Sequence, residues 1–248
     1  FFKYFSFWPW YFFSITICLF MSFIYLRYTN NIYETSAKIE IIDKAQDNEM
    51  ALPTAMTIFN RSMINLENEI GVLSSLSLHL KVVKRLKSNF EFYTVGRIKT
   101  SQNHSSEWFN DYEIYLKNTN YTIDKSYRYK ILIDDGKLTI FSYNDGDLIE
   151  ELNSKSLSTL NTDNNLLFEL IINDKIKNAS KELIIQPLEK VANEFKKNTQ
   201  IVTSGQESDQ LDIYLRHTNL IISDEYINTL ISEFDLDGIY DRQLEYKR

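Results

Sequence analysis

Apolar residues dominate the start of the chain, and their pattern predicts a membrane span. Between Lys3 and Arg27 lie 23 residues without a charged side chain. As a helix that rises about 1.5 Å per residue they would extend roughly 34 Å, slightly more than the ~30 Å hydrocarbon core of a bilayer. A signal peptide would need a shorter apolar region and a cleavage site of small residues. A buried core helix seldom needs so many consecutive aromatic residues, so we expect a transmembrane helix within residues 1–29.

Aromatic side chains stand at both ends of this apolar segment, as they do in the interfacial belts of spanning helices. Pro9 falls in the expected first turn, where its missing amide hydrogen is tolerated. One lysine before the segment and one arginine after it give no charge asymmetry that would orient the span. The residues expected to anchor the helix at the two membrane–water interfaces are Trp8, Trp10, Tyr25, Arg27 and Tyr28.

The hydrophobic period changes twice after the apolar segment. Residues 33–42 alternate apolar and polar positions, which predicts a half-buried strand, and residues 43–53 predict a polar loop. Over residues 60–88 apolar residues recur at steps of three and four, which predicts an amphipathic helix of about eight turns. Gly71 or the serine pair 74–75 would interrupt this helix. Because so few residues separate the span from the strand, we expect the following domain to sit rigidly on the membrane surface.

The remainder of the chain predicts short strands and two helices. Residues 92–112 have no period and predict a loop, and Asp-Gly pairs then mark hairpin turns between strands of a small antiparallel meander. The expected strands are 112–116, 127–133, 137–143, 147–152 and 183–186, followed by a hairpin over 199–217. Pro187 begins one helix. A final helix runs from about 224 to 248, and its expected buried stripe is Ile227, Leu230, Ile231, Phe234, Ile239 and Leu244.

Composition narrows the classes of function. The formal net charge of −7 argues against a nucleic-acid partner, which is usually met by a clustered basic face. Cys18 is the single cysteine, so neither a disulfide framework nor a thiolate metal site is expected. The three histidines, His79, His104 and His217, lack metal-ligand spacing and are expected to be surface or cap residues. No glycine-rich phosphate-binding motif occurs, and we expect no cofactor in this segment.

Three charged stretches resemble binding sites, but each is better explained as a helix face. Residues 233–238 place acids at positions 1, 3 and 5 and glycine at position 6, as in a calcium-binding EF-hand loop. The bidentate glutamate that such a loop requires at position 12 is replaced by Leu244, so an acidic helix face is the favoured interpretation. The basic runs 81–87 and 194–198 alternate with apolar residues at helical spacing and predict solvated faces.

The order of these features along the chain resembles that of a known protein family. Residues 25–43 join the apolar segment to the first strand, and the long helix carries an E-I-x-x-L-x-S core. Residues 92–101 and the stretch from 183 into the final helix complete the pattern. The core residues, which the resemblance assigns to structural or oligomer contacts, are Glu69, Ile70, Leu73 and Ser75. In this order the features resemble the N-terminal half of the Wzz-type chain-length determinants, or polysaccharide co-polymerases, above all the Bacteroidetes-like versions fused to a tyrosine autokinase (Wzc-like).

The resemblance implies an α+β protein with one N-terminal transmembrane helix and a mixed α/β domain in the periplasm. Residues 1–29 would be the cytoplasmic edge and span, 30–218 the periplasmic domain, and 219–248 the start of a helix leading to a coiled coil. Such a protein lies in the bacterial inner membrane as a homo-oligomer. Its partners are the lipid bilayer, the polysaccharide polymerase, the outer-membrane export machinery and the nascent polysaccharide, whose length it sets. No catalysis is expected of these residues, and a kinase would lie beyond Arg248.

Two other readings of the sequence stay open. An extracytoplasmic sensor domain of a membrane receptor kinase also places an α/β domain after a single span. A membrane-tethered hydrolase would need a Ser/His/Asp or paired-carboxylate site, and the three isolated histidines do not assemble one. The reading frame after Arg248 would separate the first two, because a second span followed by a Walker-type kinase favours the co-polymerase.

Overall fold

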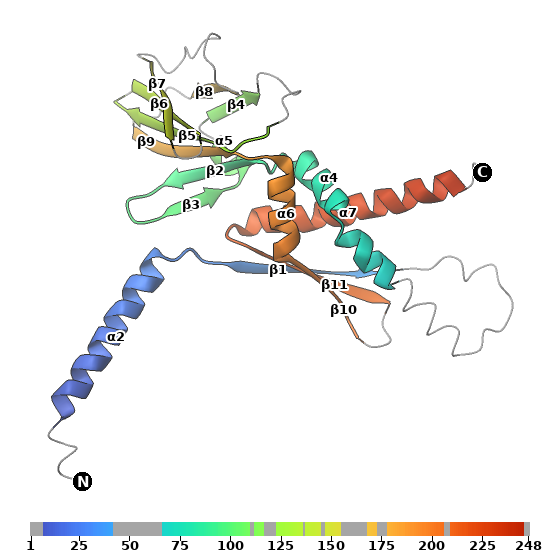
Figure 1. The fold of residues 1–248 in the computed structure, drawn as a ribbon, viewed down its shortest axis with the longest axis horizontal. Coiled ribbons are helices and arrows are strands. Elements are labelled where there is room, and N and C mark those ends of the chain that lie inside the picture. Colours follow the sequence, from blue (N-terminus) through green and yellow to red (C-terminus); the bar gives the residue numbers. More distant parts are fainter. Residues whose placement is uncertain are drawn as a thin grey trace.

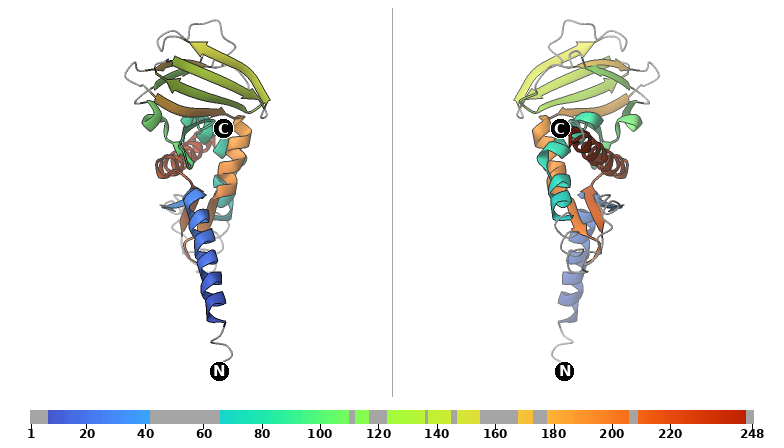
Figure 2. Two further views of the ribbon diagram at one scale, coloured as in Figure 1. Left: turned by 90° about the vertical axis from the view of Figure 1, so that its left-hand side faces the viewer. Right: turned by 90° about the vertical axis from the view of Figure 1, so that its right-hand side faces the viewer.

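A computed structural model describes most of the chain as one projecting helix and two sheet-based layers (Figure 1). The residues that it describes are 7–41, 66–109, 112–116, 123–135, 137–144, 147–154, 168–172, 178–205 and 209–245. Seen from the side, the projecting helix lies at one end of the molecule, a large sheet lies at the opposite end, and a smaller sheet with its helices lies between them (Figure 2). This mixture of helices and antiparallel sheets agrees with the α+β prediction.

The projecting helix, α2, covers Trp8–Tyr28 and is long and apolar enough to cross a membrane. None of its residues is buried by the rest of the chain, so its apolar surface has no cover within the described part of the protein. Pro9 stands in the first turn, as expected. The helix ends where Thr29 turns to an extended conformation (φ −79°, ψ 134°) while its amide still donates to the Tyr25 carbonyl. Four residues, 29–32, connect α2 to the first strand.

The smaller sheet has the order β1-β11-β10 and forms the base of the domain. β1 (Tyr33–Glu40) pairs antiparallel with β11 (Gln210–His217) along its whole length, and β10 (Thr199–Thr203) pairs with the other edge of β11. As predicted, alternate residues of β1 are less exposed: Thr35, Ala37 and Ile39. These face a core shared with the helices, which includes Leu73, Leu78, Val82, Val83, Val191, Ala192, Leu211, Ile213, Leu215, Tyr226, Ile227 and Leu230.

Four helical segments cover one face of the base sheet. Residues 66–73 are helical, and the helix is interrupted at Ser74 and Ser75 before α4 (Leu76–Leu86) begins. The predicted interruption therefore falls at the serine pair. The Ser75 hydroxyl accepts the Leu78 amide at 3.3 Å and caps α4. The other two are α6 (Leu188–Asn198) and α7 (Leu220–Glu245). Residues 43–53 and 60–65 of the predicted loop and helix lie outside the described residues.

The large sheet is antiparallel with the order β3-β2-β9-β5-β6-β7, and it is inserted between α4 and α6. Its strands are β2 (Phe90–Val95), β3 (Thr100–Asn103), β5 (Tyr127–Asp134), β6 (Lys137–Asn144), β7 (Asp147–Ser154) and β9 (Asn178–Ile185). Three of the four strands predicted as a meander are the consecutive neighbours β5-β6-β7 of this sheet; the fourth, residues 112–116, lies in a separate two-stranded sheet. Asp135, with a φ of 45°, occupies the β5–β6 turn where a residue that tolerates positive φ was expected. One face of this sheet packs a second core that includes Phe92, Trp108, Tyr129, Ile131, Ile140, Phe168 and Leu183.

The prediction of a loop over residues 92–112 was wrong. This stretch holds β2, β3 and the short helix α5 (Ser105–Phe109), whose Trp108 is fully buried against Phe92 with ring centroids 4.8 Å apart. β2 appears irregular because Tyr93 and Val95 occupy the face opposite its two phenylalanines, so the alternation of apolar and polar residues is lost after Glu91. A strand pair was also missed in part: β4 (Tyr112–Leu116) was predicted, but its partner β8 (Phe168–Ile172) was not.

The last two helices differ slightly from the predictions. α6 begins one residue later than expected, because Pro187 is the N-cap of the helix and not its first helical residue. α7 begins at Leu220 rather than 224, because the Asn219 side chain accepts the amides of Ile221 (2.9 Å) and Ile222 (3.2 Å) and so caps the helix earlier. Ile239 is 47% exposed and does not belong to the buried stripe. The Leu244 side chain lies outside the described residues.

Candidate functional site

A cavity of about 660 Å³ lies where the large sheet meets the helices of the base. Its lining comes from three stretches of sequence that are far apart: residues 86–105, 184–198 and 217–225. The residues that carry polar groups into this lining are Lys87, Ser88, Glu91, Tyr93, Gln102, Asn103, His104, Ser105, Gln186, Glu194, Asn198, His217 and Glu225. The cavity is therefore a product of the packing of the two layers, and we treat it as the candidate site.

β2 supplies one wall of the cavity. Phe92 packs in the core of the large sheet and also borders the cavity, while its neighbours Glu91 and Tyr93 project from the opposite face of the strand and carry polar groups into the lining. The Glu91 carboxylate accepts hydrogen bonds from the Tyr93 hydroxyl at 2.9 Å and from Gln186 Nε2 at 2.7 Å. Burial raises the pKa of Glu91 and also that of Tyr93, which the nearby Glu91 carboxylate raises further. The cavity wall thus holds a carboxyl group that is partly removed from water.

α6 supplies the opposite wall. Glu194 and Asn198 line the cavity beside Phe195, whose ring lies parallel to the Tyr226 ring at 4.0 Å and to the His217 ring at 5.6 Å between centroids. Burial lowers the pKa of His217. These stacked rings fix the position of the His217 side chain at the edge of the cavity.

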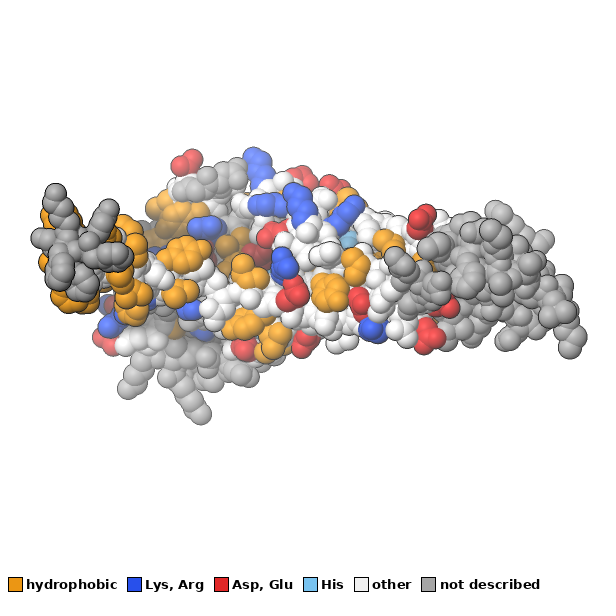
Figure 3. Space-filling view, turned by 90° about the horizontal axis from the view of Figure 1, so that it is seen from below, with side chains coloured by type: hydrophobic (Ala, Val, Ile, Leu, Met, Phe, Trp, Pro, Cys, Tyr) orange, Lys and Arg blue, Asp and Glu red, His pale blue; other side chains and the backbone are white. Residues whose placement is uncertain are grey.

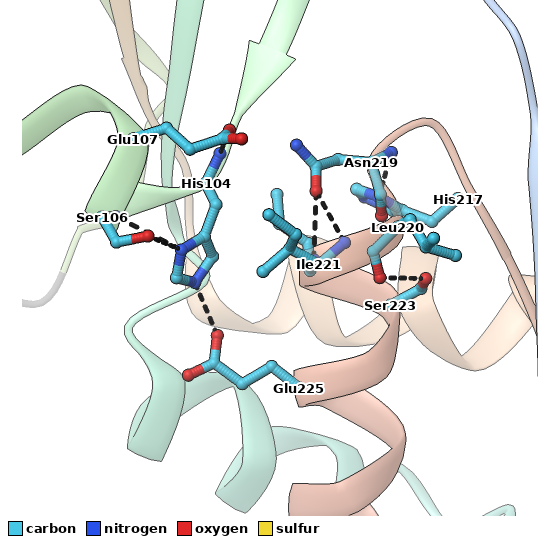
Figure 4. A network of polar contacts seen from close by, with 10 residues as sticks. His104, Ser106, Glu107, His217, Asn219, Leu220, Ile221, Ser223 and Glu225 are labelled. Atoms are coloured by element: carbon cyan, nitrogen blue, oxygen red, sulfur yellow. Dashed lines mark hydrogen bonds and ion pairs between the residues drawn. The ribbon is translucent and has the colours of Figure 1, made fainter.

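His104 closes the cavity on the side of β3 and points toward Glu225 of α7 (Figure 4). The Ser106 amide donates to His104 Nδ1 at 3.2 Å, which makes Nδ1 an acceptor and leaves the proton of the neutral ring on Nε2. Nε2 then donates to the Glu225 carboxylate at 2.7 Å. Because His104 precedes α5 and Glu225 belongs to α7, this hydrogen bond joins the large sheet to the base.

Two further hydrogen bonds join the same two layers. Asn219 Nδ2 donates to the Gln102 carbonyl at 3.1 Å, while the Thr218 hydroxyl donates to Gln102 Oε1 at 3.0 Å. Since Asn219 also caps α7, the start of that helix is held against β3. The amide of Asn219 lies 3.0 Å from His217 Nδ1, so His104 and His217 both accept an amide hydrogen bond from the residue two positions later. His104 precedes α5 directly, as a cap residue would, whereas His217 ends β11 and the cap of α7 is Asn219.

His79 is the exception among the histidines, because the prediction of a surface or cap position was wrong for it. It lies on α4, is only 1% exposed, and pairs through Nδ1 with the Tyr226 hydroxyl at 2.6 Å. Burial, and then the positive charge of Lys196, lowers the pKa of His79 to about 4. His79 therefore belongs to the base core, not to the cavity.

A second cavity of about 530 Å³ extends the first toward the end of α2. Both are lined by Tyr93, Gln102, Glu194, Asn198 and His217. The second is lined in addition by residues 30–33, which follow α2, and by Lys99, Ser101, Arg216 and Thr218. Together the two cavities run from the junction with α2 to the junction of the two layers.

The larger cavity is lined by several groups that can accept hydrogen bonds. Glu91, Glu194 and Glu225 line it with one lysine, Lys87, and two histidines, His104 and His217, among side-chain amides and hydroxyls. Such a lining matches a ligand rich in hydroxyl or amine donors. Among the residues that the structure describes, no group of three or more histidine, cysteine, aspartate or glutamate side chains could hold a metal ion.

The residues that the sequence singled out lie elsewhere. Trp8, Trp10, Tyr25, Arg27 and Tyr28 are all exposed along α2. In the other predicted set, Leu73 is fully buried in the base core, Ile70 packs against it, Ser75 caps α4, and burial raises the pKa of Glu69. This set is brought together near the start of α4 and does not line either cavity. Sequence reasoning missed the cavity residues; the single acidic residue Glu91 between Phe90 and Phe92 was the signal available.

The charged helix faces are confirmed, with a specific arrangement. Glu233 and Asp237 lie on α7 and pair with Arg85 and Lys81 of α4, both at 2.6 Å. Both basic side chains are about half exposed, so each pair is worth at most about 1 kcal/mol. Residues 233–238 are helical and do not form a calcium-binding loop.

Comparison of the sequence with protein-family models and with curated proteins found no match. The assignment of a function therefore depends on the residues and on the structure.

Proposed function

We propose that the chain is a membrane-anchored polysaccharide co-polymerase that regulates the chain length and export of a capsular polysaccharide or exopolysaccharide. In this proposal it lies in the bacterial inner membrane with its bulk in the periplasm, and it acts as a homo-oligomeric scaffold beside the polymerase without catalysing a reaction itself. The observation that carries the proposal is the direct joining of a helix long enough to span a membrane to the base sheet through only four residues.

The arrangement of the base supports a scaffold in which α7 is held in a fixed position relative to α2. β1 is hydrogen-bonded to β11 over eight residue pairs, and β11 leads into α7 through the Asn219 cap. The path from α2 to α7 is therefore made of paired strands and a capped helix, with residues 29–32 as its single unpaired connection. On the distal half of α7, Leu236 and Ile239 are about half exposed and offer apolar contacts to a second copy.

Deletion and complementation test the proposal. We expect loss of the gene to change the length distribution or the amount of surface polysaccharide on a gel, and the intact gene to restore it. A six-residue glycine-serine insertion after Asn30 should fail to restore length control, because it separates the base from the span. The same insertion after Asp135, in the exposed β5–β6 turn, is the matched control and should restore it. An unchanged polysaccharide after deletion would refute the function; normal length control with the Asn30 insertion would refute only the rigid connection.

The larger cavity favours a second candidate, an extracytoplasmic sensor domain of a membrane receptor kinase. A sensor needs a ligand site whose occupancy changes the relation between two parts of the molecule. The cavity lies between the two layers, and His104–Glu225 crosses the same junction. Reading the gene downstream of residue 248 separates the candidates: a histidine-kinase dimerisation helix supports the sensor, and a second span followed by a Walker-type kinase supports the co-polymerase.

A further inference from the structure

The β2–β3 hairpin ends in an exposed basic tip. Gly96, Arg97, Ile98 and Lys99 are all exposed, and Ile98 is 44% exposed although it is aliphatic. Within the described part of the chain, neither Arg97 nor Lys99 takes part in an ion pair. The tip thus presents two cations with an exposed aliphatic side chain between them, in a chain of net charge −7.

The hairpin holds this tip in a fixed shape. Gly96 and Lys99 close the turn through a hydrogen bond from the Gly96 amide to the Lys99 carbonyl at 3.2 Å. A Cβ on residue 96 would lie 2.7 Å from that carbonyl oxygen, so the turn requires glycine. Just behind the turn the Thr94 hydroxyl donates to Asn103 Oδ1 at 2.6 Å across the two strands.

The tip lies beside the end of the membrane span. Lys99 lines the smaller cavity together with Asn30, Asn31, Ile32 and Tyr33, the residues that directly follow the span and its connection to β1. Figure 1 shows the hairpin extending over the upper end of α2, on the same side of the molecule. Seen from below, the face next to α2 carries lysine and arginine side chains interspersed with acidic ones (Figure 3). The tip therefore lies near the level at which the chain leaves the bilayer.

We propose that the tip formed by Arg97, Ile98 and Lys99 docks on the anionic lipid headgroups around α2. The two cations meet lipid phosphates, and Ile98 enters the boundary between headgroups and acyl chains. A single cation near an anionic leaflet contributes about a fivefold preference for the bound position, so two contribute about 25-fold. This second contact adds to the four-residue connection in fixing the tilt of the domain on the membrane. The inference needs only the bilayer that α2 spans and is independent of the proposed function.

The single cysteine of the chain makes a direct test feasible. Cys18→Ser removes the native thiol, and Ile98→Cys then carries a nitroxide spin label on the full chain in bilayer nanodiscs. The matched control is Cys18→Ser with Leu148→Cys, because Leu148 is similarly exposed at 53% but belongs to β7, at the far edge of the large sheet. The ratio of oxygen to nickel-chelate accessibility, measured by power saturation, reports whether each label is near lipid or in water.

In nanodiscs of phosphatidylcholine with phosphatidylglycerol, we expect label 98 to have a ratio typical of the interface and label 148 a ratio typical of water. Arg97→Gln with Lys99→Gln should move label 98 back to water in the same lipid, while circular dichroism shows an unchanged fold. Equal, water-like ratios at 98 and 148 in anionic lipid would overturn the proposal. An interfacial ratio at 98 in pure phosphatidylcholine that survives the double substitution would overturn its electrostatic basis.

Discussion

Replacing His79 with asparagine should remove a defined part of the acid sensitivity of the fold. His79 is buried in the base core, and its pKa falls from 6.5 to about 4 because burial, followed by the charge of Lys196, disfavours the protonated ring. Since the folded pKa lies below the unfolded one, the unfolded chain binds the proton first as the pH falls. The contribution of His79 to stability is therefore complete above about pH 7 and is lost progressively as the pH falls from 6.5 toward 4.

The size of this loss follows from the two pKa values. Between pH 7.5 and pH 5 the protonation of His79 in the unfolded chain lowers the free energy of unfolding by about 2 kcal/mol. His79→Asn removes this dependence. It also leaves the Tyr226 hydroxyl without its partner at 2.6 Å, which costs about 1–3 kcal/mol at any pH. The informative quantity is the difference in slope between the two proteins, because the constant cost cancels.

Urea unfolding of the full chain in detergent micelles provides the measurement. Circular dichroism at 222 nm follows α4, α6 and α7, which belong to the same core as His79. At pH 7.5 we expect the variant to be the less stable protein, and at pH 5 the gap should narrow by about 2 kcal/mol. His217, whose pKa burial also lowers, is present in both proteins and cancels in the comparison. Parallel pH profiles for the two proteins would refute the assignment of a neutral, buried His79.

Three further predictions, which involve five substitutions, can be checked by urea unfolding. Gly71→Ala should stabilise the protein by about 0.4–1 kcal/mol, because the added Cβ meets nothing within 4 Å in a helix. Gly96→Ala should destabilise the protein, because its Cβ would meet a backbone oxygen. A change in stability of the same sign for both variants would contradict the geometry. Leu230→Ala removes a fully buried side chain and should lower the free energy of unfolding by about 2–5 kcal/mol. Leu236 is half exposed on the same helix, so Leu236→Ala should change the free energy of unfolding by less than about 0.5 kcal/mol. Equal losses of stability would contradict the packing of α7. Ser75→Ala removes the cap of α4 and should cost about 1 kcal/mol, and a neutral result would argue against the cap.

The sequence by itself determined the elements whose signal is local. The absence of charge between Lys3 and Arg27 is enough to predict α2, because the cost of placing charge in hydrocarbon makes such a segment distinctive. The alternation over residues 33–42 and the Asp-Gly turns likewise predicted β1 and the meander, since each depends on residues that are neighbours in the chain. The serine pair 74–75 marked the break in the helix for the same reason.

Only the tertiary structure decided which residues meet. β2 pairs with β9, more than 80 residues later, and this non-local pairing is what turns Glu91 and Tyr93 away from the core and toward α6. His79 lies on a helix whose sequence also fits an exposed position, and it is buried because α7 brings Tyr226 to within 2.6 Å of it. The cavity is assembled from three separate stretches of the chain. Periodicity indicates which face of an element is covered, but the partner that covers it is set by packing between elements that the sequence keeps far apart.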